Sequence, residues 1–190
     1  MKVFDFDNTI YDGESAYDFF KFCLSRKKSL IKYMPEVMYN LGKYKAGKIG
    51  MDEVYAFCDK MMGVFFENSA EADHLLKRFW KLNDYKLKPS ILKLVCDEDA
   101  IISASPEFLL EPIKSKLKAK TIICTKTEGA HLVFLCYGKN KVKAFNEHFG
   151  NEEVDEFYTD SINDLPMMKK AKKAYMVKGR SIKKFTFDEK

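Results

Sequence analysis

Short hydrophobic runs alternate with amphipathic stretches along most of the chain. Each run is short and apolar or aromatic, a composition that favours strands. The runs of this kind are Lys2–Phe6, Ala100–Ser103, Thr121–Thr125, Phe157–Thr159 and Ala174–Val177. Several of them are separated by helical patterns, in which apolar residues recur every three or four positions. Strands that alternate with helices predict a parallel sheet in an α/β domain.

Two further segments fit the same pattern. Leu132–Tyr137 is another extended candidate, and it is followed by Gly138 in a Gly-Lys-Asn sequence that is typical of turns. Lys141–Phe149 has the spacing of a helix, which we expect Gly150 to end.

The stretch from Ser15 to Leu87 interrupts the alternation. Its apolar residues have helical spacing, as in Phe19, Phe20, Cys23 and Leu24, and again in Val54, Phe57, Cys58 and Met61. This spacing predicts several helices with no strand between them. We therefore expect a doubly wound, Rossmann-like α/β core made of residues 1–14 and 88–190. A helical cap, residues 15–87, is expected to be inserted after the first strand.

The composition narrows the class of protein. Of the 190 residues, 46% are hydrophobic and 32% are charged, which is typical of a globular protein. No run reaches the roughly 18 apolar residues that a membrane span needs. Because the first strand begins at Lys2 and carries acids, we expect no signal peptide and a cytoplasmic location. The net charge of +5, without a dense basic stripe, does not support nucleic-acid binding. The five cysteines contain no Cys-x-x-Cys pair, so we expect buried thiols and no zinc site.

The first predicted strand delivers two carboxylates, Asp5 and Asp7, near its carboxyl end. Residues two apart on a strand face the same way, so both charges start on one side. A shared proton or a cation must offset their repulsion, and the hard cation Mg²⁺ suits oxygen ligands best. The alternative is a strand end with ordinary Asp-Asn turn chemistry.

Three later segments fall where an α/β site would collect residues. Ser103 ends a strand, close to a helix start that Ser105 is expected to cap with Pro106 in the first turn. Lys141 lies in the first turn of a predicted helix, where its charge could meet a phosphate. Asp160 follows the strand Phe157–Thr159 and could join Asp5 and Asp7 around a metal.

Four motifs together resemble the signature of the haloacid dehalogenase superfamily of phosphohydrolases. They are Asp5-x-Asp7-x-Thr9, Ser103, Lys141 and Asp160-x-x-Asn163-Asp164, in the order and spacing of that family. The motifs span nearly the whole chain. The helical insertion resembles the cap of the phosphoserine phosphatase-like branch of that superfamily. Glu14 matches a glutamate that contacts the substrate in that branch.

The resemblance implies an enzyme, a Mg²⁺-dependent phosphomonoester hydrolase that acts on a small phosphorylated metabolite through an aspartyl phosphate. It assigns Asp5 as the nucleophile. It assigns Asp7 as the acid that protonates the leaving oxygen and then activates water. It places Mg²⁺ on the Asp5 carboxylate, the Asp7 backbone carbonyl and Asp160.

The resemblance also assigns supporting roles. The implied phosphate-binding residues are Thr9, Ser103, Ala104 and Lys141. Asn163 and Asp164 are expected to orient the metal and Lys141 indirectly, by contacts with their ligands or with water. Glu14 is expected to influence substrate choice, and an amine-bearing compound such as phosphoserine is one candidate. The branch also uses a cap arginine to hold phosphoserine, but neither Arg26 nor Arg78 lies at the matching distance from Glu14.

Alternatives stay open at this point. One is a phosphotransferase or phosphomutase of the same superfamily, and another is a phosphate-binding module without turnover. The cap's aromatic residues are expected to form its core, with an exposed lipid-binding face as the alternative. These residues are Phe19, Phe20, Phe22, Tyr33, Tyr39 and Tyr44. We expect a monomer or a homodimer with a small phosphorylated substrate, no nucleic-acid partner and no membrane span.

Overall fold

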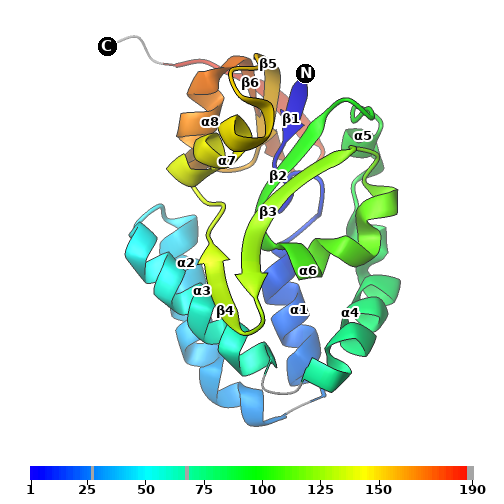
Figure 1. The fold of residues 1–190 in the computed structure, drawn as a ribbon, viewed down its shortest axis with the longest axis vertical. Coiled ribbons are helices and arrows are strands. Elements are labelled where there is room, and N and C mark those ends of the chain that lie inside the picture. The colour runs from blue at the N-terminus through cyan, green and yellow to red at the C-terminus, as the bar shows by residue number, and fades with distance from the viewer. Residues whose placement is uncertain (27, 67–68, 188–190) are drawn as a thin grey trace.

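The computed structural model describes residues 1–26, 28–66 and 69–187 and contains a seven-stranded sheet (Figure 1). The predicted domains also include residues 27, 67–68 and 188–190, which lie outside the described residues. The strands are β1 (Lys2–Phe4), β2 (Ala100–Pro106), β3 (Thr121–Glu128), β4 (His131–Phe134), β5 (Val154–Thr159), β6 (Ala171–Lys178) and β7 (Ser181–Phe185). Their order across the sheet is β4-β3-β2-β1-β5-β6-β7.

The first strand of the chain, β1, lies in the middle of this sheet. It pairs in parallel with β2 and β5, and β3 and β6 continue the parallel sheet on either side. β4 and β7 add antiparallel strands at the two edges. The prediction of an α/β class with a mostly parallel sheet is therefore confirmed. Since the strand order reverses beside β1, ligands are expected at the carboxyl ends of these strands.

Both faces of the sheet are covered, as the continuous hydrophobic strands require. The helices along the sheet are α5 (Pro89–Leu92), α6 (Glu107–Leu110), α7 (Lys139–Phe149) and α8 (Leu165–Lys170). Val3 belongs to a buried cluster that contains Phe145 of α7 and Met168 of α8. Its neighbour Phe4 belongs to the cluster on the other face, which contains Trp80. Successive side chains of β1 therefore point to opposite faces of the sheet and pack into two different hydrophobic cores.

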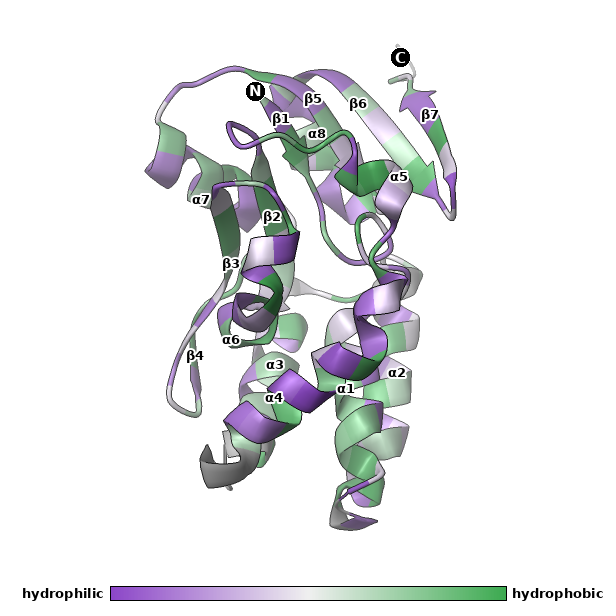
Figure 2. Ribbon diagram, turned by 90° about the vertical axis from the view of Figure 1, so that its right-hand side faces the viewer, coloured by the Kyte–Doolittle hydropathy of each residue, from purple (hydrophilic) through white to green (hydrophobic). Residues whose placement is uncertain are grey.

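The long helical stretch follows β1 directly. In the described residues, its α-helices are α1 (Ser15–Leu24), α2 (Met34–Lys45), α3 (Met51–Phe66) and α4 (Ser69–Asn83), with 3-10 turns at Lys28–Tyr33 and Asp84–Lys86. The helices gather at the end of the molecule towards which β3 runs, beyond the carboxyl ends of the parallel strands (Figure 1). In Figure 2, α4 is largely hydrophilic, whereas much of α1 and α2 is hydrophobic. We refer to residues 15–87 as the cap.

A β-hairpin of the core reaches the cap. β4 lies alongside α3, and two hydrogen bonds join them. Tyr55 Oη donates to Leu132 O at 2.6 Å, and Leu132 N donates to Asp59 Oδ1 at 2.8 Å. The side chains of Leu132 and Val54 belong to the same small buried cluster. The hairpin therefore forms one wall of the space between cap and core.

One predicted helix start is wrong. Ser105 was expected to cap a helix with Pro106 in its first turn, but β2 continues to Pro106 and α6 begins at Glu107. The Ser105 hydroxyl donates to Asp7 instead, at 2.6 Å from Oδ2. As a helix cap the hydroxyl would accept from a backbone N–H group, whereas here it donates to a carboxylate, and a hydrogen bond to a charged group is the stronger of the two.

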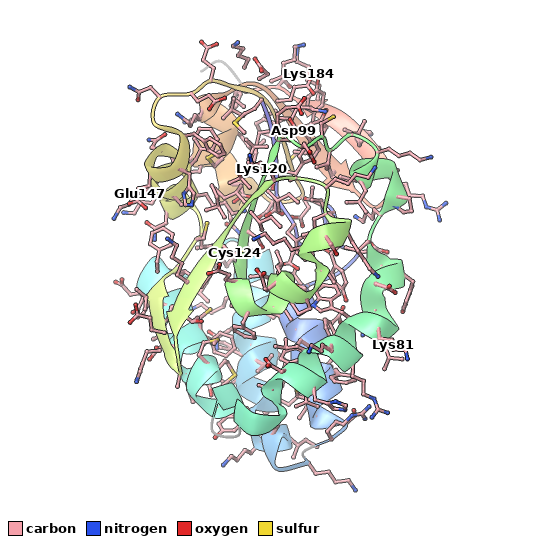
Figure 3. The ribbon with its side chains drawn as sticks, turned by 45° about the vertical axis from the view of Figure 1, so that its right-hand side comes forward. Lys81, Asp99, Lys120, Cys124, Glu147 and Lys184 are labelled. Carbon is pink, nitrogen blue, oxygen red and sulfur yellow. The ribbon has the colours of Figure 1, made fainter. Side chains whose placement is uncertain are left out.

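Another buried acid lies at the opposite end of the sheet. Asp99 is 2% exposed and accepts hydrogen bonds from Lys2 N at 2.8 Å and Cys96 N at 2.9 Å. Figure 3 shows Asp99 at the end of the core away from the cap helices. Its backbone donors explain its burial, so Asp99 joins two segments of the core.

The aromatic residues of the cap divide between core and surface. Phe19 is 5% exposed, whereas Tyr39 is 67% exposed. Phe20, Phe22 and Tyr33 are partly buried against the main cluster. The side chain of Tyr44 lies outside the described residues. None of the helices in the described part of the chain has the length and apolar character needed to span a bilayer.

Candidate active site

Three neighbouring strands end beside one another under the cap. Phe4 of β1 is paired with Ile101 of β2 and with Tyr158 of β5. Asp5 N donates to Tyr158 O at 2.8 Å. This register brings Asp5 between the segments that carry Ser103 on one side and Asp160 on the other. The sheet thus collects residues from three distant parts of the sequence.

Lys141 lies behind Asp5. Its Nζ is 2.7 Å from Asp5 Oδ1 and 2.7 Å from Asp164 Oδ2, and the residue is 2% exposed. Thr159 Oγ1 donates to the same Asp164 oxygen at 2.8 Å. Gly138 directly precedes α7 with a φ of +54°, a left-handed conformation that glycine adopts without strain. The chain can thus turn sharply into α7 and carry Lys141 inward.

Burial and mutual repulsion change the pKa values of this cluster. Burial raises the pKa of Asp5 well above its usual value, although Lys141 opposes the shift. Burial, together with the Asp164 and Asp7 carboxylates, raises the pKa of Asp160 to about 6. Burial alone would lower the pKa of Lys141, but the charges of Asp164 and Asp5 outweigh it and raise that pKa. Additional positive charge would therefore stabilise the ionised acids.

Asp7 is held by hydrogen bonds of its own. Its Oδ1 accepts from Ser15 N at 2.6 Å, and its Oδ2 accepts from Ser105 Oγ at 2.6 Å. The two serine hydroxyls lie 2.8 Å apart. Burial raises the pKa of Asp7, and the hydrogen bonds from Ser105 and Ser15 oppose that shift. Because Ser15 is the first residue of α1, the start of the cap helps to position this carboxylate.

The loop that carries Asp7 is shaped by Asn8. Asn8 has a φ of +53°, a left-handed conformation that asparagine tolerates better than most residues. Its backbone N donates to Gly13 O at 2.9 Å, and its carbonyl oxygen accepts from Lys88 Nζ. Its side-chain Nδ2 donates to Glu14 Oε1 at 2.7 Å. Lys88 is 8% exposed, so a buried ammonium helps to hold the loop.

Of the other predicted phosphate-binding residues, Thr9 contacts Asp5 directly. Thr9 and Ser103 are fully buried. Thr9 Oγ1 donates to Asp5 Oδ2 at 3.3 Å, and Ser103 Oγ accepts from Ser105 N at 3.0 Å. Ala104 lies between the two serines and lines the adjoining cavity.

Asn163 faces the cap. A Cβ atom placed on Gly47 would lie 3.6 Å from Asn163 Oδ1, so the loop between α2 and α3 reaches this motif. Its motif partner Asp164 points the other way, to Lys141. The two residues therefore occupy different sides of the site, although they are adjacent in sequence.

A cavity of about 230 Å³ lies between the cap and the core and reaches Asp7. α1, α2 and α3 of the cap contribute to its walls, together with the end of β2 and the segment from β4 to Tyr137. Glu14 and Ser105 also line it. Asp7 thus connects the buried acid cluster to a partly open cavity.

The donor set of the cluster fits a hard cation. The residues predicted to hold Mg²⁺ supply only oxygen atoms, from the Asp5 and Asp160 carboxylates and the Asp7 backbone carbonyl. In the described part of the chain, the salt bridges of this cluster are those of Lys141 to Asp5 and Asp164, and Asp7 and Asp160 have none. No group of three or more His, Cys, Asp or Glu side chains within the described residues forms a ready-made metal site. The predicted ligand set contains only two such side chains, Asp5 and Asp160, because its third ligand is a backbone carbonyl.

Sequence reasoning missed four supporting residues. Ser15 and Ser105 hold Asp7, Thr159 holds Asp164, and Lys88 holds the loop at Asn8. Ser105 and Thr159 each lie next to a predicted strand end, which could have suggested a polar role. Ser15 is the first residue of the cap and Lys88 directly follows it, and their function depends on how the cap joins the core.

Comparison with known proteins identifies the family of the chain. The sequence profile of haloacid dehalogenase-like hydrolases matches residues 3–169. No curated protein sequence matched the chain. A protein of unknown function from Bordetella pertussis Tohama I has a similar structure, with a TM-score of 0.74 and 19% identity over 89% of this chain and 85% of that one.

Two other solved structures share the fold. A phosphoserine phosphohydrolase-like protein from Francisella tularensis has a TM-score of 0.60 and 19% identity, over 92% of this chain and 86% of that one. A phosphoserine phosphatase studied as a phospho-aspartyl intermediate analogue has a TM-score of 0.52 and 17% identity, over 90% of this chain and 83% of that one. At this level of identity the structures support the fold, and the profile match over most of the chain identifies the family. The chain belongs to the haloacid dehalogenase-like hydrolases, as its motifs predicted.

Proposed function

We propose that this hydrolase is a Mg²⁺-dependent phosphatase that cleaves a small phosphomonoester through an aspartyl phosphate on Asp5. The observation that carries the proposal is that Asp5 and Asp7 have different surroundings. Asp5 is buried against Lys141, at 2.7 Å, whereas Asp7 lines the cavity. This difference supports a role for Asp5 at the phosphoryl group and for Asp7 at the leaving group.

In the first step, an oxygen of Asp5 attacks phosphorus, and the bond between phosphorus and the leaving oxygen breaks. A carboxylate can act as such a covalent nucleophile. Asp7 donates its proton to the leaving oxygen, so that a neutral alcohol departs. Lys141 and the Ser103 region would hold the phosphoryl oxygens, and Lys141 would also keep Asp5 oriented.

In the second step, Asp7 acts as a base. It takes a proton from a water molecule, which attacks phosphorus and releases inorganic phosphate from Asp5. The raised pKa of Asp7, which burial causes, suits a group that must both give and take a proton. Asp164 and Thr159 would keep the Lys141 ammonium in place during both steps.

A bound Mg²⁺ would neutralise negative charge on the phosphoryl oxygens and on the acids. Asp5, Asp160 and the Asp7 carbonyl are the residues we propose to hold it. The excess of carboxylates over buried cations in this cluster supports the assignment. Asn163 and Asp164 would orient these groups from outside.

The substrate is expected to be a small phosphorylated compound. An amine-bearing substrate such as phosphoserine would have to direct its ammonium group at Glu14. The Glu14 carboxylate lies on the cavity wall, where it already accepts a hydrogen bond from Asn8. A cytoplasmic location and a monomeric or homodimeric state stay predictions from the sequence.

Replacing Asp5 by Asn tests the proposed nucleophile. Turnover of p-nitrophenyl phosphate should fall by at least about 10³-fold, because loss of a nucleophile removes the covalent route. The matched control is Asp12→Asn, since Asp12 lies on the same loop with an exposed side chain. Steady-state kinetics with circular dichroism would decide. A folded Asp5→Asn protein with a tenth of the wild-type activity would contradict the assignment.

Metal removal tests the proposed cofactor. Excess chelator should abolish turnover, and added Mg²⁺ should restore it, because uncompensated acids would repel the phosphoryl group. Ca²⁺ should inhibit, because its larger and looser coordination would displace Asp5. Activity assays on protein dialysed against chelator provide the measurement. Undiminished turnover in metal-free buffer would exclude the Mg²⁺ requirement.

Replacing Ser105 by Ala tests the positioning of Asp7. A well-placed general acid–base group contributes about 10²–10⁴-fold, so the loss of one hydrogen bond should lower kcat by about tenfold. KM should change little, because Ser105 acts through Asp7. The control is Ser25→Ala, since the Ser25 hydroxyl is exposed and donates to Phe22 O within the cap. If both variants keep the wild-type kcat, Ser105 has no role in placing Asp7.

A further inference from the structure

The cavity beside Asp7 has an apolar lining that the phosphatase chemistry itself does not require. One wall is the stripe of α3 made by Val54, Phe57, Cys58 and Met61. These residues recur at three- and four-residue spacing, so they share one face of the helix. Such a stripe normally packs against a core, but here it also borders an open space of about 230 Å³.

The polar side chains of the lining largely point to protein partners. Thr125 Oγ1 donates to Ala104 O at 2.7 Å and accepts from Cys136 N at 3.0 Å. Asn40 Nδ2 donates to Glu36 O at 2.9 Å. Ser105 Oγ donates to Asp7. These groups offer little hydrogen bonding to a polar leaving group.

The charges of the lining have one sign. Asp7 and Glu14 are the charged residues that line the cavity among the described residues, and no lysine or arginine there accompanies them. A carboxylate or second phosphate on the leaving group would meet two acids and no cation. Burial of an unpaired charge is strongly unfavourable, so an anionic leaving group does not match this space.

Because the cavity is partly open, its volume sets how much of the occupant can be buried. An apolar cavity of about 150 Å³ accepts a benzene ring. In proportion, about 230 Å³ holds an uncharged group of roughly six to nine carbon atoms. The cavity begins at Asp7, the proposed proton donor to the leaving oxygen, so its occupant would be attached to that oxygen.

We propose that the substrate is the phosphate monoester of an apolar, uncharged alcohol, and that the alcohol fills this cavity against the α3 stripe. This inference rests on the proposed function and names its substrate class. Phosphoserine would be a poor substrate, because its carboxylate would lie among apolar side chains and acids. The phosphate would bind at Asp5 and Lys141 as for any phosphomonoester.

A series of linear alkyl phosphates from ethyl to dodecyl tests the substrate class. Each buried methylene should raise kcat/KM by about three- to fourfold, as transfer of a methylene from water predicts. The rise should stop at roughly six to nine carbon atoms, where the cavity is full. Phosphoserine should be turned over at least tenfold less efficiently than hexyl phosphate.

Two variants test the location. Cys58→Phe adds volume inside the cavity, so it should move the optimum to shorter chains and lower kcat/KM for octyl phosphate at least tenfold. Phe57→Ala should move the optimum to longer chains. The two variants should therefore shift the optimum in opposite directions. The matched control is Cys96→Phe, since Cys96 is exposed and belongs to the core segment before β2.

Binding provides a readout that does not need turnover. Calorimetric titration of Asp5→Asn with octyl phosphate should give a more negative heat-capacity change than titration with ethyl phosphate, since burial of apolar surface has this signature. The inference is overturned if kcat/KM does not depend on chain length, if phosphoserine is preferred, or if Cys58→Phe leaves the optimum unchanged. Failure of the proposed function would differ, because no phosphomonoester would then be hydrolysed.

Discussion

The ammonium group of Lys141 is buried, and the arrangement of the site follows from the need to pair it. A buried charge is tolerated only with close counter-charges and hydrogen bonds. Asp5 and Asp164 supply the counter-charges at 2.7 Å each, and Thr159 holds Asp164. These contacts join β1, the end of β5 and helix α7 at one point. Any shift of these elements would leave a charge unpaired, so the pairing keeps the acid that we propose as nucleophile in a defined orientation.

The cap adds a second constraint, which acts on Asp7. The chain leaves the core through the loop around Asn8 and enters α1 at Ser15, whose backbone N donates to Asp7. Ser105 of β2 completes the support from the core side. The acid that would protonate the leaving group is therefore held jointly by cap and core. Asp7 and Ser105 also line the apolar cavity. The contacts that hold the acid therefore lie beside the space that we propose for the leaving group.

Local sequence signals predicted much of this arrangement. Hydrophobic runs and glycine positions indicated most of the strands and α7, and the apolar spacing of Phe19, Phe20, Cys23 and Leu24 indicated the helix that is α1. The motif acids and Lys141 could be anticipated because each lies beside a strand end or helix start. Ser15 and Lys88 could not be assigned, because their contacts depend on how the cap joins the core. The contact of Ser105 with Asp7 depends on the pairing of β2 with β1. The spacing of the α3 stripe predicted one face of a helix. The cavity beside this face depends on how the cap packs on the core, which the sequence does not show.

Detection of phosphate on Asp5 is the most direct test of the central claim. Wild-type protein and the Asp7→Asn variant would be mixed with p-nitrophenyl phosphate, whose leaving group needs little protonation, then quenched in acid and digested. Mass spectrometry should find one phosphoryl group on the peptide that contains Asp5, with a larger amount in Asp7→Asn because water is no longer activated. Turnover by the wild type with no modified Asp5 peptide in either protein, or with the phosphoryl group on another residue, would contradict the account.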